Sequence, residues 1–207
     1  NDVNELNNPL LNLSKKINTD LKIFFKSIKK YSNLLNFDKK NWLKSCENIK
    51  NKNEIKNIYS NSEPIDMYRF LYDLCEYSKK ETILITDAGS NYYIGGQAWK
   101  FKKKQTEISS TTNAAMGLSL PLSIGAAVSS KKQVFSVTGD GSIELNIQEL
   151  KTISHYKLNI KTFVINNGGY VSMQKWQDDY FEKNRLDTSK ITGVGTLNFK
   201  NIAKAFD

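Results

Sequence analysis

The spacing of apolar residues changes near position 60 of the 207-residue chain. Two groups of apolar residues before that position recur at the spacing of one helix face: Leu21, Phe24, Phe25 and Ile28, and then Trp42, Leu43, Cys46 and Ile49. They predict two helices, with Asp38 placed to cap the second. This part contains little strand sequence. We therefore interpret residues 1–60 as the C-terminal part of a central domain followed by a linker.

After Pro64 the pattern alternates between helices and short apolar strands. The predicted helices cover 66–77, 114–128 (interrupted by Pro121) and 143–156, and the predicted strands cover 82–86, 134–138 and 162–166. Apolar strands that alternate with helices are typical of a parallel sheet covered on both faces. The fold class predicted for residues 61–207 is α/β, a parallel sheet with helices on both faces. The chain stops inside what looks like another strand–helix repeat, so we expect this domain to be C-terminally incomplete.

Two of these strands end on polar residues that suit a cation site. VFSVT is followed by Gly139-Asp140-Gly141-Ser142, and TFVI is followed by Asn166-Asn167. Neighbouring parallel strands end at one edge of a sheet, where open α/β sheets bind ligands. A carboxylate and an amide oxygen suit Mg²⁺, which keeps other positions for phosphate oxygens and water. Ser142 is placed to cap the following helix. An Asp-Gly turn alone is ordinary, but its combination with Asn167 one helix later predicts a site for magnesium and a diphosphate.

The formal net charge of +9 raises the question of nucleic-acid binding. The lysines are scattered and arginines are few, so a solvated basic surface is the simpler interpretation. The densest run, at 102–104, is predicted to be a solvated loop. No apolar stretch approaches about 20 residues, the first residues do not form a signal peptide, and the two cysteines lack metal-type spacing. These features predict a cytoplasmic protein that binds neither membranes nor nucleic acid.

Several segments resemble thiamine-diphosphate-dependent enzymes. GDG, residues 142–165 and Asn166-Asn167 together look like the diphosphate-binding motif of that family, and AAMGLSLPLSIGAA at 114–127 is similar to another family segment. GDGSIELNIQELKTI and KWQDDYFEKNRLDT resemble most closely the large catalytic subunit of acetolactate synthase. NNGGYVSM and TDAGSNYYIGGQAW are similar to acetolactate-synthase-like proteins of surface-polysaccharide synthesis. The resemblance runs from about residue 62 to the end.

The resemblance implies roles for individual residues. Magnesium would be bound by the side chains of Asp140 and Asn167 and by the carbonyl oxygen of Gly169. The residues implied to contact the cofactor, mostly at its diphosphate, are Ala88, Gly89, Ser90, Asn91, Gly141, Ser142 and Tyr170. Met116 matches the bulky residue that wedges the two cofactor rings into a bent shape, and the carbonyl of Ala114 would accept from the 4′-amino group.

Trp176, nine residues after Asn167, matches the tryptophan that shapes the pocket for the acceptor 2-keto acid. Without the surrounding motifs, the favoured interpretations would be a core-filling Met116 and a tryptophan used only for packing.

By this resemblance the chain is part of an acetolactate-synthase-like carboligase. Such an enzyme decarboxylates pyruvate on thiamine diphosphate and adds the hydroxyethyl carbanion to a second 2-keto acid. A pyrimidine-binding domain, of the same or a partner subunit, supplies the activating glutamate, so we expect the 207 residues alone to be inactive. FAD, bound mostly by the middle domain of such enzymes, is expected only in the full enzyme. The implied assembly is a homodimer or homotetramer.

Ser172 stands where acetolactate synthases carry a methionine near the substrate, so other interpretations stay open. One is a related enzyme that acts on another 2-keto acid, or on a keto-sugar nucleotide in surface-polysaccharide biosynthesis. Another is a non-enzymatic cofactor-binding remnant or a basic nucleic-acid-binding module. Asp140, Gly141 and Asn167 are all intact, which argues against a decayed site.

Overall fold

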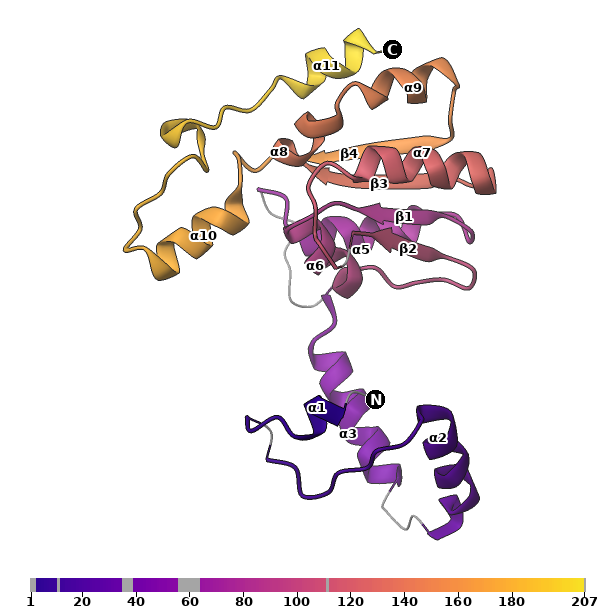
Figure 1. Ribbon diagram of the computed structural model, residues 1–207. Helices are drawn as coiled ribbons and strands as arrows, with labels where there is room; N and C mark the ends of the chain where they lie inside the picture. Colours follow the sequence, from indigo (N-terminus) through magenta and orange to yellow (C-terminus); the bar gives the residue numbers. More distant parts are fainter. Residues whose placement is uncertain (1–2, 11, 35–38, 56–63, 111, 207) are drawn as a thin grey trace. The chain divides into compact units, whose positions relative to one another are not determined.

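The chain forms two compact units, Asn1–Lys52 and Asn53–Asp207. The computed structural model describes residues 3–10, 12–34, 39–55, 64–110 and 112–206. The described part of the first unit contains helices, as predicted (Figure 1), and a long irregular stretch between the first two: the helices are α1 Val3–Leu6, α2 Leu21–Lys30, the short 3-10 helix η1 Ser32–Leu34 and α3 Lys39–Lys52. Asp20 caps α2, because its Oδ1 accepts a hydrogen bond from the amide of Lys22 at 2.8 Å. The predicted cap Asp38 and the predicted boundary at residue 60 lie outside the described residues.

The second unit is built on a parallel sheet of four strands in the order β2-β1-β3-β4 (Figure 1). The strands are β1 Ile83–Thr86, β2 Thr106–Ser109, β3 Val134–Gly139 and β4 Ile160–Ile165. β3 and β4 pair in register from Val134 opposite Ile160 to Gly139 opposite Ile165. The strands that precede GDG and the two asparagines are therefore neighbours with coincident carboxyl ends, which confirms the prediction.

Helices cover both faces of this sheet, and the predicted α/β class is confirmed. On one face lie α5 Met67–Tyr77 and α6 Ser90–Ala98, over a buried core of Leu71, Cys75, Leu84, Ala98, Trp99, Phe135 and Val137. On the other face lies α7 Ser119–Ser130, over a core of Ile83, Ile85, Ala126, Ala127 and Val134. Successive strand residues point to opposite faces, so a strand buried on both sides must be apolar throughout.

Two predicted helices are wrong in their bounds. α7 begins at Ser119 instead of residue 114, because Ala114 and Gly117 adopt positive φ angles of 47° and 83° that a right-handed helix excludes. Pro121 consequently lies in the first turn, where its missing N–H leaves no hydrogen bond unmade. The helix predicted over 143–156 is divided into α8 Asp140–Ile143, the 3-10 helix η2 Glu144–Asn146 and α9 Glu149–His155.

The predicted capping role of Ser142 is also wrong. α8 already begins at Asp140, after an N-cap at Gly139 that contributes no side-chain hydrogen bond. The carboxylate of Asp140 itself accepts from the amide of Gly141 at 2.9 Å, which satisfies a donor of the first turn. Ser142 is therefore a buried residue inside α8.

Four elements of the second unit leave little trace in the pattern of apolar and polar residues. β2 alternates exposed and half-buried residues at the edge of the sheet, and α6 contains two glycines. α10 Val171–Tyr180 and α11 Phe199–Ala205 contain no buried residue. None of these four elements was predicted from the apolar pattern of the sequence.

The lysine run at 102–104 is only partly a solvated loop. Lys102 Nζ donates to the carbonyls of Cys75, Glu76 and Ser78 at 2.8, 2.9 and 3.1 Å. These carbonyls lie at the C-terminal end of α5, where the last helical oxygens lack intrahelical partners and a positive charge is favourable. Lys102 therefore stabilises the end of a core helix.

Replacing Ser123 with alanine is expected to raise the free energy of unfolding by about 1 kcal/mol. Ser123 on α7 is fully buried, and its Oγ has no hydrogen-bond partner within the described parts of the chain. Ser130→Ala is the matched control on the same helix, because the Oγ of Ser130 donates to the carbonyl of Ala126 at 2.6 Å. Urea unfolding of both variants checks this, and an equal response of the two would contradict it.

Candidate cofactor site

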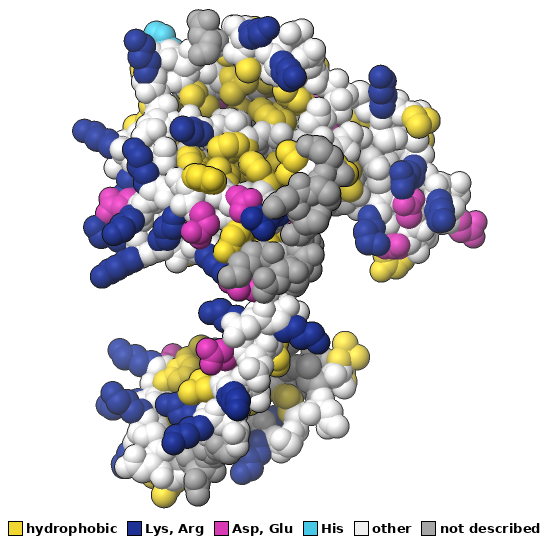
Figure 2. All heavy atoms as spheres, turned by 180° about the vertical axis from the view of Figure 1, so that it is seen from behind, with side chains coloured by type: hydrophobic (Ala, Val, Ile, Leu, Met, Phe, Trp, Pro, Cys, Tyr) yellow, Lys and Arg dark blue, Asp and Glu magenta, His cyan; other side chains and the backbone are white. Residues whose placement is uncertain are grey.

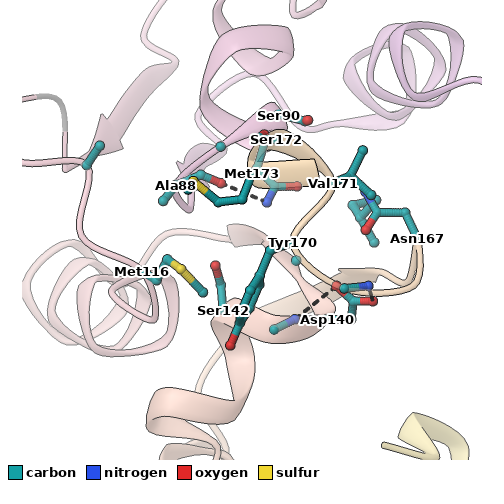
Figure 3. A pocket seen from close by; sticks show the side chains of 17 residues that line it. Ala88, Ser90, Met116, Asp140, Ser142, Asn167, Tyr170, Val171, Ser172 and Met173 are labelled. Carbon is teal, nitrogen blue, oxygen red and sulfur yellow. Dashed lines mark hydrogen bonds between the residues drawn. The ribbon is translucent and has the colours of Figure 1, made fainter. Parts of the chain in front are cut away.

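A pocket of about 210 Å³ lies at the carboxyl ends of β1, β3 and β4 (Figure 3). Four separate segments of the chain line it, at 88–91, 114–116, 139–142 and 165–173. The lining residues are Ala88, Gly89, Ser90, Asn91, Ala114, Met116, Gly139, Asp140, Gly141, Ser142, Ile165, Asn167, Gly169, Tyr170, Val171, Ser172 and Met173. All the predicted site residues except Trp176 are among them.

Asp140 is held in place by backbone amides. Its side chain is 1% exposed; Oδ1 accepts from Gly141 N, and Oδ2 accepts from Gly168 N and Gly169 N, each at 2.9 Å. These bonds join the end of β3 to the turn after β4. A carboxylate has about four lone-pair sites, so the three amides leave one for a further donor or a cation.

Asn167 lines the same pocket from the turn after β4, whereas its neighbour Asn166 lines a different hollow with residues 196–200. Figure 3 shows the side chain of Asn167 on the same side of the pocket as Asp140. The side chain of Asn167 is exposed, and no hydrogen bond joins it to another residue of the described chain. Within the described ranges no three His, Cys, Asp or Glu side chains cluster, so a cation here would depend on one carboxylate plus amide and carbonyl oxygens.

The turn after β4 is fixed by the loop that follows α10. Gly169 has a φ of +115°, and a Cβ at this position would lie 2.5 Å from the carbonyl oxygen of Thr188. The amide of Tyr170 donates to the same oxygen at 2.9 Å. Only glycine fits at 169, where the backbone passes close to Thr188 while the amides of Gly168 and Gly169 donate to Asp140.

The ring of Tyr170 packs over the start of α8. A Cβ added to Gly141 would lie 2.2 Å from Cε1 of Tyr170. Figure 3 shows the ring between Ser142 and Asp140, inside the pocket. The backbone of α8 can approach this ring closely because residue 141 has no side chain.

The turn after β1 contributes polar groups to the opposite side. The side chain of Asn91 is 5% exposed; its Nδ2 donates to the carbonyl of Ala88 at 3.2 Å, while its Oδ1 has no partner among the described residues. Ser172 comes close to this turn, since a Cβ on Gly89 would lie 3.3 Å from its Oγ. This side of the pocket thus offers an unpaired buried amide oxygen and a hydroxyl.

Met116 and Ala114 come from the loop before α7. Figure 3 shows Met116 pointing into the pocket. Ala114 has a φ of 47°, a conformation that glycine adopts at lower cost.

Trp176 does not line this pocket. It lies on α10, is 50% exposed, and packs against Tyr180 and Phe181 with ring centroids 5.5 and 5.2 Å apart. The first residues of α10 line the pocket in its place, and the sequence prediction missed Val171 and Met173. Their only signal was their position directly after the Gly168–Tyr170 turn. The role of Trp176 in an acceptor pocket stays a prediction.

Comparison with known proteins agrees with this geometry. Residues 87–207 match the family described as thiamine pyrophosphate enzyme, C-terminal TPP binding domain. Three relatives illustrate the likeness. The acetolactate synthase large subunit of Porphyra purpurea is 38% identical over 61% of this chain, and that of Lactococcus lactis subsp. lactis is 27% identical over 94%. The probable acetolactate synthase large subunit of Methanocaldococcus jannaschii is 34% identical over 70%.

The matched regions are only part of those proteins. They span 21% of the Porphyra, 34% of the Lactococcus and 25% of the Methanocaldococcus subunit. The family match nonetheless begins directly after β1 and covers β2, β3, β4 and all four segments of the pocket. The chain therefore belongs to the thiamine pyrophosphate enzyme family through a C-terminal TPP-binding domain similar to that of acetolactate synthase large subunits.

Proposed function

We propose that this pocket binds magnesium and thiamine diphosphate, and that the chain is the cofactor-binding part of an acetolactate-synthase-like carboligase. The observation that carries the proposal is the convergence of Asp140 and Asn167, from neighbouring strand ends, on a pocket that also contains Met116 (Figure 3). The family match and the names of the relatives support it.

The residues present fit a hard cation. Asp140 keeps one lone-pair site after its three amide bonds, and the Asn167 side chain has no partner among the described residues. With the carbonyl of Gly169, these two side chains would hold Mg²⁺, and phosphate oxygens and water suit its remaining positions. The unpaired Oδ1 of Asn91 is a buried acceptor on the opposite side of the same pocket. A buried acceptor without a partner favours a ligand that brings a donor.

The same pocket offers a place for each part of the organic ligand. The backbone at 88–91 and 141–142 would bind the diphosphate, and Met116 and the carbonyl of Ala114 would orient the rings. When bound, thiamine diphosphate supplies an electron sink for breaking and forming carbon–carbon bonds, which amino-acid side chains lack. The chain's own residues bind the ligand, fix its orientation and exclude water from it.

We further propose the reaction of the complete enzyme: pyruvate loses carbon dioxide and its two remaining carbons join a second 2-keto acid. A pyrimidine-binding domain of the same or a partner subunit would complete the site. Assignment of residues 1–60 to a central domain, FAD in the full enzyme, a homodimer or homotetramer, and a cytoplasmic location stay predictions.

A second candidate differs only in the acceptor. Ser172 places a hydroxyl beside Gly89 in the pocket where acetolactate synthases have a methionine, which favours a more polar acceptor such as another 2-keto acid or a keto-sugar nucleotide. Analysis of the products formed by the complete enzyme from pyruvate alone separates the two, since abundant acetolactate would favour the first.

The interpretation of the chain as a nucleic-acid-binding module finds less support. Figure 2 shows Lys and Arg side chains at several places on the displayed face of the larger unit, with hydrophobic patches and Asp and Glu side chains between them, whereas nucleic-acid binding favours a continuous basic stripe. Across the described ranges, no helix has the length and hydrophobicity needed to cross a bilayer.

A thermal-shift measurement tests the proposed function. With millimolar magnesium and thiamine diphosphate together, the melting temperature of the chain is expected to rise by about 5 °C, because a ligand that binds only the folded state stabilises it. Either compound alone should give a smaller shift, and DNA oligonucleotides none. Asp140→Ala should abolish the response; a response that survives this change at full size would refute the metal assignment.

A further inference from the structure

A buried carboxylate lies directly behind the pocket and does not line it. Asp87 follows β1 and is 2% exposed. Its Oδ1 accepts from Ala88 N at 2.8 Å and Gly117 N at 3.0 Å, and its Oδ2 accepts from Ser119 N at 3.4 Å and Thr138 Oγ1 at 2.9 Å. These four bonds use the roughly four lone-pair sites of the carboxylate, so Asp87 has no acceptor capacity left for a ligand. It joins the end of β1 to β3 and to the loop that precedes α7.

Gly117 is held from its other side as well. Asn146 Nδ2 donates to the carbonyl of Gly117 at 2.9 Å. Gly117 has a φ of +83°, and a Cβ at this position would lie 2.7 Å from Cβ of Leu145 and 3.1 Å from the carbonyl oxygen of Ser142. One peptide segment is thus held at its N–H by a buried carboxylate and at its C=O by an amide, and it packs closely against residues 142–145.

Met116 precedes this fixed residue and projects into the pocket (Figure 3). A methionine side chain has three rotatable bonds and adapts readily to its surroundings. Its backbone must therefore be held by other groups if the side chain is to occupy one part of the pocket. Asp87 and Asn146 provide that restraint through Gly117.

We propose that Asp87 and Asn146 are positioning residues that hold Met116 against the ring portion of the bound ligand. The proposal rests on the proposed function for the identity of that ligand. Neither side chain lines the pocket, so both act through the backbone of Gly117. Such positioning differs from a general stabilising role in its selective effect: without it, binding of the ring portion weakens while diphosphate binding does not.

The test compares two ligands on the 207-residue chain, thiamine diphosphate and inorganic diphosphate, each with magnesium, by isothermal titration calorimetry. Asp87→Asn keeps the shape but replaces one acceptor oxygen with a donor. This variant is expected to lower the affinity for thiamine diphosphate by about tenfold and the affinity for inorganic diphosphate by less than about twofold. Thr138→Val is the matched control, because it removes one bond to the same carboxylate without touching the 117–119 loop. It should change neither affinity by more than about twofold.

A second variant approaches the loop from the other side. Asn146→Ala removes the bond to the Gly117 carbonyl and should reproduce the selective loss even if Asp87→Asn does not fold. Equal weakening of both ligands by either variant would overturn the proposal, as would no weakening of either. If the unaltered chain binds neither ligand, the proposed function fails. In that case amide exchange by NMR still tests the restraint, because exchange at Gly117 or Ser119, whichever faces the new amide nitrogen, should be faster in Asp87→Asn than in Thr138→Val. Equal exchange rates would reject it.

Discussion

Replacing Asn167 with alanine is expected to lower the affinity for magnesium-dependent thiamine diphosphate by at least about tenfold, while the free energy of unfolding changes by less than about 0.5 kcal/mol. The two effects separate because this side chain is exposed and has no hydrogen-bond partner in the described chain. Its removal therefore breaks no contact that stabilises the fold. Calorimetric titration and urea unfolding measure the two quantities.

The neighbouring residue supplies the control. Asn166 has the same side chain, is also exposed, and lines a hollow with residues 196–200 instead of the pocket. Asn166→Ala should leave the affinity unchanged within about twofold. If the two alanine variants lose affinity to the same extent, Asn167 is not a ligand and the proposed cation site is wrong.

Gly141→Ala is expected to reduce both ligand affinity and stability. The new Cβ would lie 2.2 Å from Cε1 of Tyr170, so either the ring or α8 must move inside the pocket. Overpacking of this kind costs about 1–3 kcal/mol of unfolding free energy. Because the displaced groups line the site, thiamine diphosphate should bind at least about tenfold more weakly.

Two comparisons isolate the steric cause. Gly125→Ala on α7 adds a methyl group where nothing lies within 4 Å, so it should stabilise the chain by up to about 1 kcal/mol through helix propensity. In a Tyr170→Ala background the clash is absent, and Gly141→Ala should then cost less than about 0.5 kcal/mol. A full cost in that background would show that contact with Tyr170 is not the reason for glycine at 141.

The sequence predicted those parts of the fold that depend on burial. ILIT of β1 and VFSVTG of β3 are buried almost throughout, and the continuous apolar runs that result indicate strands covered on both faces. The helix α5 places Leu71 and Cys75 in the core at helical spacing and begins after the N-cap Asp66. Burial and capping both leave a local signal.

The missing elements depend on contacts that no local pattern reports. β2 is at the edge of the sheet, and α10 buries no residue. The start of α7 depends on positive φ angles at Ala114 and Gly117, and Gly117 is hydrogen-bonded to Asp87 and Asn146, which are 30 and 29 residues away in sequence. Ser142 does not cap the helix as predicted, because the carboxylate of Asp140 already accepts a hydrogen bond from an amide of the first turn.

All the predicted site residues except Trp176 line one pocket, including those outside the motif, at 88–91 and 114–116. Asp140 and Asn167 follow two apolar strands, so sheet topology alone brings them to one edge. Asp87 follows an apolar strand in the same way, yet its role depends on amides of a distant loop. Trp176 was assigned to the pocket because it follows Asn167 by nine residues. A sequence separation alone does not determine which way a side chain points on α10, a helix that buries none of its residues.

The pocket walls come from four stretches that are far apart in sequence, at 88–91, 114–116, 139–142 and 165–173. No wall exists in the unfolded chain, so ligand occupancy and folding are one coupled equilibrium. A ligand at a hundred times its dissociation constant adds about 2.7 kcal/mol to the folded state, a large share of the 5–15 kcal/mol typical of a domain. In a cell, the concentration of thiamine diphosphate would then affect the fraction of this polypeptide that is unfolded, and with it the rate at which proteases degrade the chain.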